Sequence, residues 1–193
     1  MPRAEATLDL LQLFDRLASL PRTGWILRGV TDAESIAEHS FGVALLCMFL
    51  VDELRTRGAV IDGERTLRMA LVHDAAEVFT GDVPMPAKTK ELSDALERAE
   101  DALLSRVLPD AELALWREAE AGLSIEARIV KSADKIQMLA KALTYEQQRR
   151  GRLDEFWQNK ANRRHMELDV AKELFEEIER RARHVRGEAK VAG

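Results

Sequence analysis

Residues 71–77 read Leu71-Val72-His73-Asp74-Ala75-Ala76-Glu77. They follow an apolar run that starts at Leu67, and this pattern indicates the last turns of a helix. Residues three and four apart share one face of a helix, so Glu77 is expected on the same side as His73 and Asp74. An adjacent His and Asp at a helix end could also pair only with each other or with water. A functional interpretation therefore depends on what the neighbouring helices contribute.

Two further ionisable residues occupy apolar stretches of other predicted helices. His39 lies in Glu38-His39-Ser40, just ahead of the apolar run 41–51. Asp134 lies in Val130-Lys131-Ser132-Ala133-Asp134-Lys135. An unpaired ionisable group is costly in such surroundings. These positions favour a shared partner for His39, His73-Asp74 and Asp134 over isolated side chains.

The pattern around these residues predicts helices along most of the chain. Ser35 and Glu38 form a capping-box pair ahead of the second helix, and Asp62 can cap the third. The predicted helices cover 7–20 with Thr7 as cap, a segment starting at Ser35, and then 62–79, 89–108, 110–121, a segment starting at Ser124, and 162–183. No run with a period of two indicates a strand.

Composition agrees with an all-α protein. Apolar residues make up 46% of the 193 residues, charged residues 33% and aromatic residues only 5%. Leu, Ala, Glu and Arg dominate, and these residues favour helices. We predict a single all-α domain, a helical bundle over residues 1–186, followed by a flexible tail over residues 187–193.

Charge and hydropathy exclude several function classes. The net charge of −5 disfavours a nucleic-acid partner, because binding a duplex requires neutralisation of its phosphates. The longest apolar stretch, 41–51, is about half of a membrane span, and no N-terminal signal precedes it. Cys47 is the single cysteine, which excludes an intrachain disulfide. We expect a cytoplasmic protein without a membrane partner, in which Cys47, Trp116 and Trp157 serve packing.

The order His…His-Asp…Asp on successive helices resembles the HD-domain metal phosphohydrolases. Residues 72–77 followed by Gly81-Asp82-Val83-Pro84 are similar to the signature of YfbR-type bacterial 5′-deoxynucleotidases and their eukaryotic HD-domain relatives, as are 21–25, 34–39 and 151–156. The resemblance implies an HD-type helical bundle that hydrolyses (deoxy)nucleoside 5′-monophosphates to nucleoside and phosphate. Its implied ligands for one divalent metal ion are His39, His73, Asp74 and Asp134.

Two imidazoles and two carboxylates suit Mn²⁺, Co²⁺, Fe²⁺ or Zn²⁺ better than a purely hard ion. Glu77 and Asp82 lie outside this ligand set, where they can orient the nucleophile or protonate the leaving 5′-oxygen. The sequence does not divide these roles between them. Of the four histidines, His165 and His184 lie in a polar C-terminal region and are expected at the surface. The count therefore favours a single-metal site over a dinuclear one.

The substrate side departs from the bacterial pattern in one place. In that branch an Arg directly precedes the Trp, whereas this chain has Gly24 there, as the eukaryotic branch does. The phosphate anchor is thus left open among Arg22, Arg28 and Lys88. Trp25 either fills the core beneath the first loop or, as the resemblance implies, forms a wall of the sugar pocket that disfavours a 2′-hydroxyl.

Other interpretations stay open. The same ligands could serve another phosphorylated small molecule, including a nucleotide analogue or a di- or triphosphate. A non-catalytic module that binds a nucleotide or a protein is a further alternative, although Glu77 and Asp82 argue against it. Residues 149–152 form either a solvated turn or the mouth of an anionic site, and Lys131 and Lys135 could neutralise a phosphate. A homodimer is expected through the apolar faces of the terminal helices.

Overall fold

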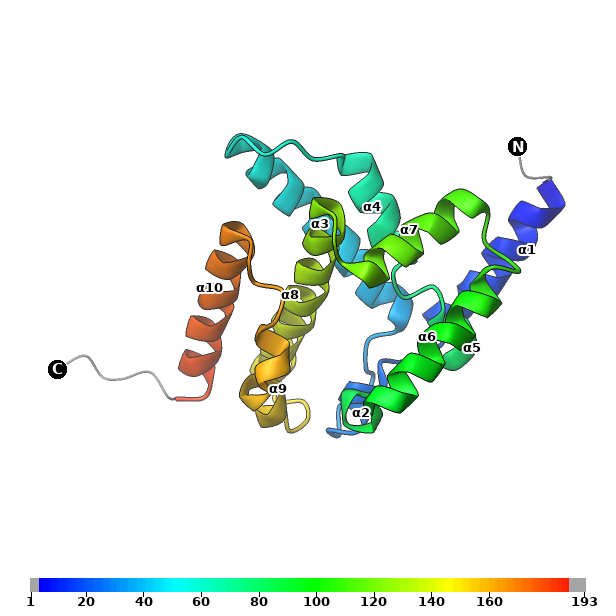
Figure 1. The fold of residues 1–193 in the computed structure, drawn as a ribbon. Helices are drawn as coiled ribbons and strands as arrows, with labels where there is room; N and C mark the ends of the chain where they lie inside the picture. The colour runs from blue at the N-terminus through cyan, green and yellow to red at the C-terminus, as the bar shows by residue number, and fades with distance from the viewer. Residues whose placement is uncertain (1–3, 188–193) are drawn as a thin grey trace.

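Helix α8 (Ile125–Gln147) lies at the centre of the molecule, and four other helices pack around it (Figure 1). The computed structural model describes residues 4–187. Helices α3 (Ile36–Thr56) and α10 (Asp169–Val185) contact α8 directly, while α4 (Gly63–Val72) and α7 (Asp110–Ala121) contact both α8 and each other. Residues 4–187 contain no strand, only an isolated bridge between Pro21 and Ser35. The predicted all-α, single-domain helical bundle is confirmed.

The remaining helical elements, most of them short, lie between and beside these five helices. They are α1 (Ala4–Asp15), η1 (Arg16–Ala18), α2 (Thr23–Ile26), α5 (Glu77–Thr80), η2 (Met85–Ala87), α6 (Lys90–Leu104), α9 (Asp154–Gln158) and η3 (Lys160–Arg163).

Side-chain caps fix the starts of four helices at the predicted residues. Ser35 accepts a hydrogen bond from the backbone N–H of Glu38, whose carboxylate accepts from the Ser35 N–H in return, which completes a capping box. Asp62, Thr89 and Ser124 cap α4, α6 and α8 in the same manner, each accepting from the backbone N–H three residues on. The cap at Ser35 places His39 in the second turn of α3.

Several predicted helix boundaries are wrong. Helix α1 begins at Ala4, upstream of Thr7, because Ala4-Glu5-Ala6 also favours a helix. The helix predicted over 62–79 ends at Val72, and a turn over 73–76 separates it from α5. The last helix starts at Asp169 instead of residue 162, since the backbone at His165 is left-handed, with φ of 65°.

The core forms around α8 and α3. Trp116, Trp157 and Cys47 are all buried, as predicted for packing residues. None of the helices within residues 4–187 combines the length and the apolar character needed to cross a membrane. Residues 188–193 of the predicted C-terminal tail lie outside the described residues.

Candidate metal centre and adjoining cavity

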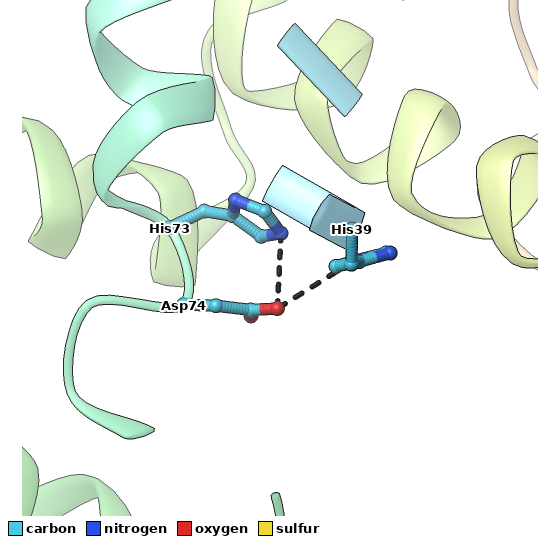
Figure 2. A group of neighbouring side chains, drawn as sticks. All are labelled: His39, His73 and Asp74. Atoms are coloured by element: carbon cyan, nitrogen blue, oxygen red, sulfur yellow. Dashed lines mark ion pairs between the residues drawn. The ribbon is translucent and has the colours of Figure 1, made fainter. Parts of the chain in front are cut away.

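Two histidines from different helices point one ring nitrogen each into the same space (Figure 2). His39, fully buried on α3, places Nδ1 2.6 Å from Oε1 of Gln137. His73 follows the last residue of α4 and places Nδ1 2.7 Å from the carbonyl oxygen of Ala70. The Nε2 atoms of both rings are buried and have no hydrogen-bond partner. Such groups are costly unless something binds them.

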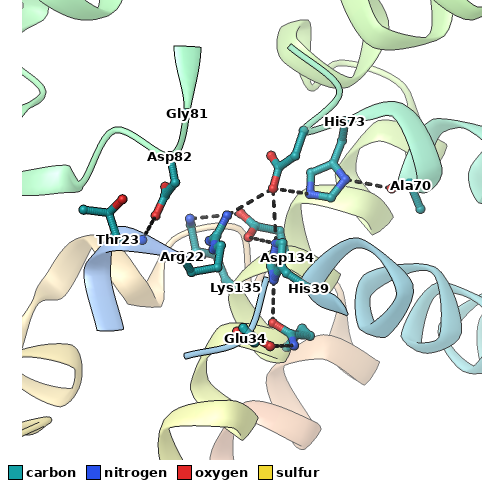
Figure 3. Close-up of polar contacts among 12 residues, drawn as sticks. Arg22, Thr23, Glu34, His39, Ala70, His73, Gly81, Asp82, Asp134 and Lys135 are labelled. Carbon is teal, nitrogen blue, oxygen red and sulfur yellow. Dashed lines mark hydrogen bonds and ion pairs between the residues drawn. The ribbon is translucent and has the colours of Figure 1, made fainter. Parts of the chain in front are cut away.

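Two carboxylates face these nitrogens. Oδ2 of Asp74 lies 3.5 Å from His39 Nε2 and 3.4 Å from His73 Nε2. Oδ1 of Asp134, on α8, lies 3.3 Å from His39 Nε2 (Figure 3). Ligands about 2.1 Å from one ion are roughly 3.0–3.4 Å apart at bond angles of about 90–109°. The spacing and the donor set therefore fit a divalent metal ion.

The turn after α4 creates this arrangement. Within it, the N–H of Ala75 donates to the carbonyl of Val72, and the N–H of Glu77 donates to that of Asp74. The turn buries Ala75 and Ala76 in a small cluster with residues of α6 and α7. His73 thus follows the last residue of α4, and Asp74 lies in the turn directly after it.

Electrostatics keep both carboxylates ionised. Burial alone would raise the pKa of Asp74, but His73, Arg22 and His39 outweigh it and lower that pKa below its usual range. Burial likewise opposes ionisation of Asp134, yet the ammonium of Lys135 and the nearby His39 hold its pKa well below the usual range. Nζ of Lys135 is 3.0 Å from Oδ2 of Asp134. Both Asp residues are therefore available as anionic ligands at neutral pH.

Glu77 and Asp82 have different environments. Burial, reinforced by the negative charge of Asp74, raises the pKa of Glu77 to about 9. Oε2 of Glu77 is buried without a hydrogen-bond partner. Asp82 accepts a 2.6 Å hydrogen bond to its Oδ2 from the backbone N–H of Thr23, which ties the loop after α5 to the start of α2 (Figure 3). The Glu77 carboxyl group is thus held in its protonated form, and the Asp82 carboxylate is fixed in orientation.

A cavity of about 180 Å³ adjoins the cluster. It brings together the carboxylates Asp74 and Asp134 with all six other candidate residues, while His39 and His73 are not among the lining residues. The predicted residues that line it are Arg22, Trp25, Arg28, Asp74, Glu77, Asp82, Lys88 and Asp134.

The predicted phosphate anchors differ in what they contact. Nη1 of Arg22 donates to Oδ2 of Asp74 at 3.1 Å, so this guanidinium lies directly beside the cluster of His and Asp side chains. Arg28 instead forms an ion pair with Glu155. Lys88 is exposed on the segment after η2. By position, Arg22 is nearest to where a metal-bound phosphate would lie.

Trp25 is both a core residue and part of the cavity wall, while its predicted role in sugar selection stays a prediction. Its side chain is almost fully buried in the core, and it also lines the cavity. The indole stacks on Phe156, with centroids 4.3 Å apart, and meets Tyr145 edge-on. Its Nε1 donates to Oε1 of Glu34 at 2.9 Å. The ring is therefore held rigidly from several sides.

Three lining residues carry no signal that sequence inspection could detect: Met138 of α8, and Asn159 and Asn162 after α9. Phe156 of α9 also lines the cavity and lies in the 151–156 stretch that resembles the family pattern. Lys135 also lines the cavity, and its place beside Asp134 was the one available hint. The lining residues of this cavity do not include the 149–152 turn, where Arg150 instead stacks on Tyr145 and bonds the carbonyl of Asp32.

The remaining histidines lie elsewhere. His184 is exposed, as predicted, but His165 is half-buried because the Ser132 hydroxyl of α8 donates to its carbonyl oxygen and draws the segment inward. Within residues 4–187, the single group of three or more His, Cys, Asp or Glu residues spaced for a metal ion is His39, His73 and Asp74.

Known proteins are similar to this chain in sequence and in fold. The HD domain family matches residues 14–178. The chain is 34% identical over 182 residues to the 5′-deoxynucleotidase HDDC2 of Xenopus laevis, across 90% of this chain and 88% of that protein. The PH0347 protein of Pyrococcus horikoshii OT3 superposes with a TM-score of 0.78 and 39% identity, over 91% of this chain and 98% of that one.

A third likeness is to a protein solved with ligands. The cyanophage S-2L HD phosphohydrolase DatZ, bound to dA and one catalytic Zn²⁺ ion, superposes with a TM-score of 0.60 and 25% identity, over 95% of this chain and 98% of that one. The family match covers most of the chain and includes the His, His-Asp and Asp positions of the cluster. The chain belongs to the HD domain family.

Proposed function

We propose that this protein is a metal-dependent phosphohydrolase that converts deoxynucleoside 5′-monophosphates to nucleoside and phosphate. The observation that carries the proposal is the pair of unpartnered, buried Nε2 atoms of His39 and His73, which face Asp74 at a cavity lined by acidic and basic side chains. The relatives that are named 5′-deoxynucleotidases support the same reaction and substrate class.

His39, His73, Asp74 and Asp134 hold one divalent ion in this proposal. The donor set suits Mn²⁺, Co²⁺, Fe²⁺ or Zn²⁺, and the Zn²⁺ in DatZ supports an ion of this type. When bound, such an ion polarises the phosphoryl group and favours loss of a proton from the attacking water.

The cavity side chains perform the remaining tasks. Arg22 and Lys135 supply positive charge beside the cluster and bind the phosphate oxygens, with Lys88 at the exposed end. The oxygen of the attacking water forms a bond to phosphorus, and the bond from phosphorus to the 5′-oxygen breaks. Glu77 gives a proton to that oxygen, Asp82 orients the water, and the proton that the water loses restores the Glu77 carboxyl group. Both carboxyl groups line the cavity beside Asp74, which supports these roles.

Trp25 selects the sugar in this proposal. Because the ring is fixed by Phe156, Tyr145 and Glu34, it cannot move away to admit a larger group. A rigid wall excludes an added hydroxyl more strongly than a mobile one. Arg28 and Glu155 lie at the same cavity, on the side of Phe156.

The test is phosphate release from the eight common ribo- and deoxynucleoside 5′-monophosphates, with Mn²⁺, Co²⁺, Zn²⁺, Mg²⁺ or chelator. Wild type is compared with Asp74→Ala and Glu77→Ala. We expect turnover of the deoxy set that disappears in both variants and in chelator. No release from any of the eight by protein shown to hold metal would refute the proposal and direct the search to other phosphate esters or to a binding role.

We also propose a homodimer that pairs through α3. Phe41, Leu45, Met48 and Phe49 lie one turn apart or adjacent on α3 and are 68, 42, 47 and 61% exposed. With about 150–250 Å² for an aromatic side chain, they present roughly 400 Å² of apolar surface. A homodimer interface needs about 800 Å² per partner, of which about 65% is apolar, so this stripe supplies most of the requirement.

Light scattering after gel filtration tests the pairing. We expect a mass of two chains for wild type and of one chain for Leu45→Glu, whereas Leu123→Glu, at an exposed leucine before α8, keeps the wild-type mass. A wild-type mass of one chain would contradict the dimer. We likewise propose a cytoplasmic location for this protein, on the basis of its sequence alone.

A further inference from the structure

Glu34 is a buried carboxylate that is not one of the proposed metal ligands. It connects the cluster of His and Asp side chains to the cavity wall. Its side chain is 1% exposed. Oε1 accepts from Trp25 Nε1 at 2.9 Å, and Oε2 accepts from Gln137 Nε2 at 3.0 Å. The other end of the Gln137 amide, Oε1, lies 2.6 Å from Nδ1 of His39. Nζ of Lys141 lies 3.4 Å from Glu34 Oε2 and balances its charge.

The chemistry of these groups fixes the direction of each hydrogen bond in the series from Glu34 through Gln137 to His39. An ionised carboxylate only accepts hydrogen bonds, so Gln137 must turn its NH₂ group toward Glu34 and its carbonyl oxygen toward His39. A carbonyl oxygen also only accepts, so Nδ1 of His39 must carry the ring proton. The lone pair is then on Nε2, the atom that faces Asp74 and Asp134.

Helix α3 leaves room for this contact. An ideal Cβ built at Gly42, three residues after His39, would lie 3.0 Å from Cγ and 3.1 Å from Nε2 of Gln137. Glycine at this position lets the amide lie flat against the helix. The Gln137 side chain is thus confined by packing as well as by its two hydrogen bonds.

We propose that Glu34 and Gln137 are positioning residues that hold His39 in its metal-binding tautomer, and that the same carboxylate fixes Trp25 in the cavity wall. This inference rests on the metal centre of the proposed function. It makes the metal ligand and the sugar wall depend on a single buried anchor, although neither Glu34 nor Gln137 lines the cavity.

Replacing Glu34 with glutamine has a defined consequence. The new amide has one oxygen, but two donors, Trp25 Nε1 and Gln137 Nε2, require an acceptor. If that oxygen serves Trp25, the Gln137 amide turns over and presents its NH₂ group to His39. Nδ1 then becomes the acceptor, and the proton moves to Nε2. Loss of an outer partner of a ligating histidine typically weakens metal binding by about 10–100-fold, and we expect a loss of that size.

The double variant Glu34→Gln/Gln137→Glu should restore the site. The amide introduced at position 34 then accepts from Trp25 with its oxygen and donates its NH₂ group to the carboxylate introduced at position 137. The second oxygen of that carboxylate accepts from His39 Nδ1–H. Every hydrogen bond is satisfied again, and the number of charges is unchanged. A residue that merely filled space would show no such reciprocity.

The experiment is calorimetric titration of metal-free protein with Mn²⁺, together with ¹⁵N NMR of the His39 tautomer, neither of which requires a substrate. Glu38→Gln, an exposed neighbour whose amide can still complete the capping box, is the control. Affinity at least tenfold weaker in Glu34→Gln, a shift of its proton to Nε2, and return to within about threefold in the double variant would support the proposal.

Wild-type affinity or an unchanged His39 tautomer in Glu34→Gln would overturn the proposal. So would a double variant that keeps the wild-type circular dichroism and unfolding midpoint but not the affinity. If the double variant does not fold, the tautomer in Glu34→Gln alone decides. A protein that binds Mn²⁺ but hydrolyses no nucleotide would refute the proposed function and leave this test intact.

Discussion

Replacing Gly151 with alanine tests how one side of the cavity is held. Gly151 has φ of +73°, and an ideal Cβ there would lie 2.6 Å from Cγ2 of Val30 and 2.9 Å from the carbonyl oxygen of Arg28. That oxygen also accepts a 2.8 Å hydrogen bond from the N–H of Arg152. The close contacts are therefore with the Val30 side chain and with backbone that cannot withdraw without breaking the link to the segment carrying Trp25.

The expected cost has separate parts. A left-handed backbone costs an alanine about 1–2 kcal/mol, and the overlap adds about 1–3 kcal/mol. The stiffer unfolded chain offsets about 0.4–1 kcal/mol. The free energy of unfolding should fall by roughly 2–4 kcal/mol. For a chain of this length, about 2–4 °C per kcal/mol predicts a Tm lower by roughly 5–15 °C.

Thermal unfolding followed by circular dichroism measures this, with Gly58→Ala as the matched control. Gly58 has φ of +90° and nothing within 4 Å of its ideal Cβ, so it reports the backbone cost alone. We expect Gly58→Ala to lower Tm by only about 2–4 °C. Equal shifts for the two variants would refute the inferred contact between Gly151 and the Arg28–Val30 backbone.

Three further predictions concern the core, the metal and the sugar. Burial raises the pKa of the Cys47 thiol to about 12, so Ellman's reagent at pH 8 should leave the native protein unmodified and label it after unfolding in urea; rapid native labelling would contradict the packing. Mn²⁺ at 100 times its Kd should stabilise metal-free protein by about 2.7 kcal/mol, which raises Tm by about 5–10 °C. Asp74→Asn should abolish that rise, and an equal rise would remove Asp74 from the ligand set. Trp25→Phe should reduce the preference for deoxyadenosine over adenosine monophosphate by about tenfold in phosphate-release assays, whereas an unchanged ratio would exclude Trp25 from sugar selection.

Local chemistry explains which helix boundaries the sequence predicts. The caps at Ser35, Asp62 and Ser124 depend on hydrogen bonds to the backbone three residues away, so they are visible in the sequence. The end of α4 at Val72 is not, because no Gly or Pro marks it. That break is stabilised by burial of Ala75 and Ala76 against residues distant in sequence.

The candidate site likewise has a part that the sequence predicts and a part that it does not. The cluster is predictable because His39, His73-Asp74 and Asp134 are ionisable groups in apolar helical surroundings and match a family pattern. Part of the cavity wall is not predictable, since Met138, Asn159 and Asn162 converge through tertiary packing. The position of Glu34 is also not predictable from local sequence, because its backbone N–H donates to the hydroxyl of Tyr145, 111 residues further along the chain.

The most direct test of the central claim is a titration of metal-free protein with Mn²⁺ while phosphate release from deoxyadenosine 5′-monophosphate is followed, at a protein concentration well above the Kd. We predict that activity rises from zero and levels off at one ion per chain, and that Asp134→Ala abolishes this rise. Full activity without metal, or an Asp134→Ala variant with the wild-type titration, would contradict the claim that His39, His73, Asp74 and Asp134 form the catalytic metal centre.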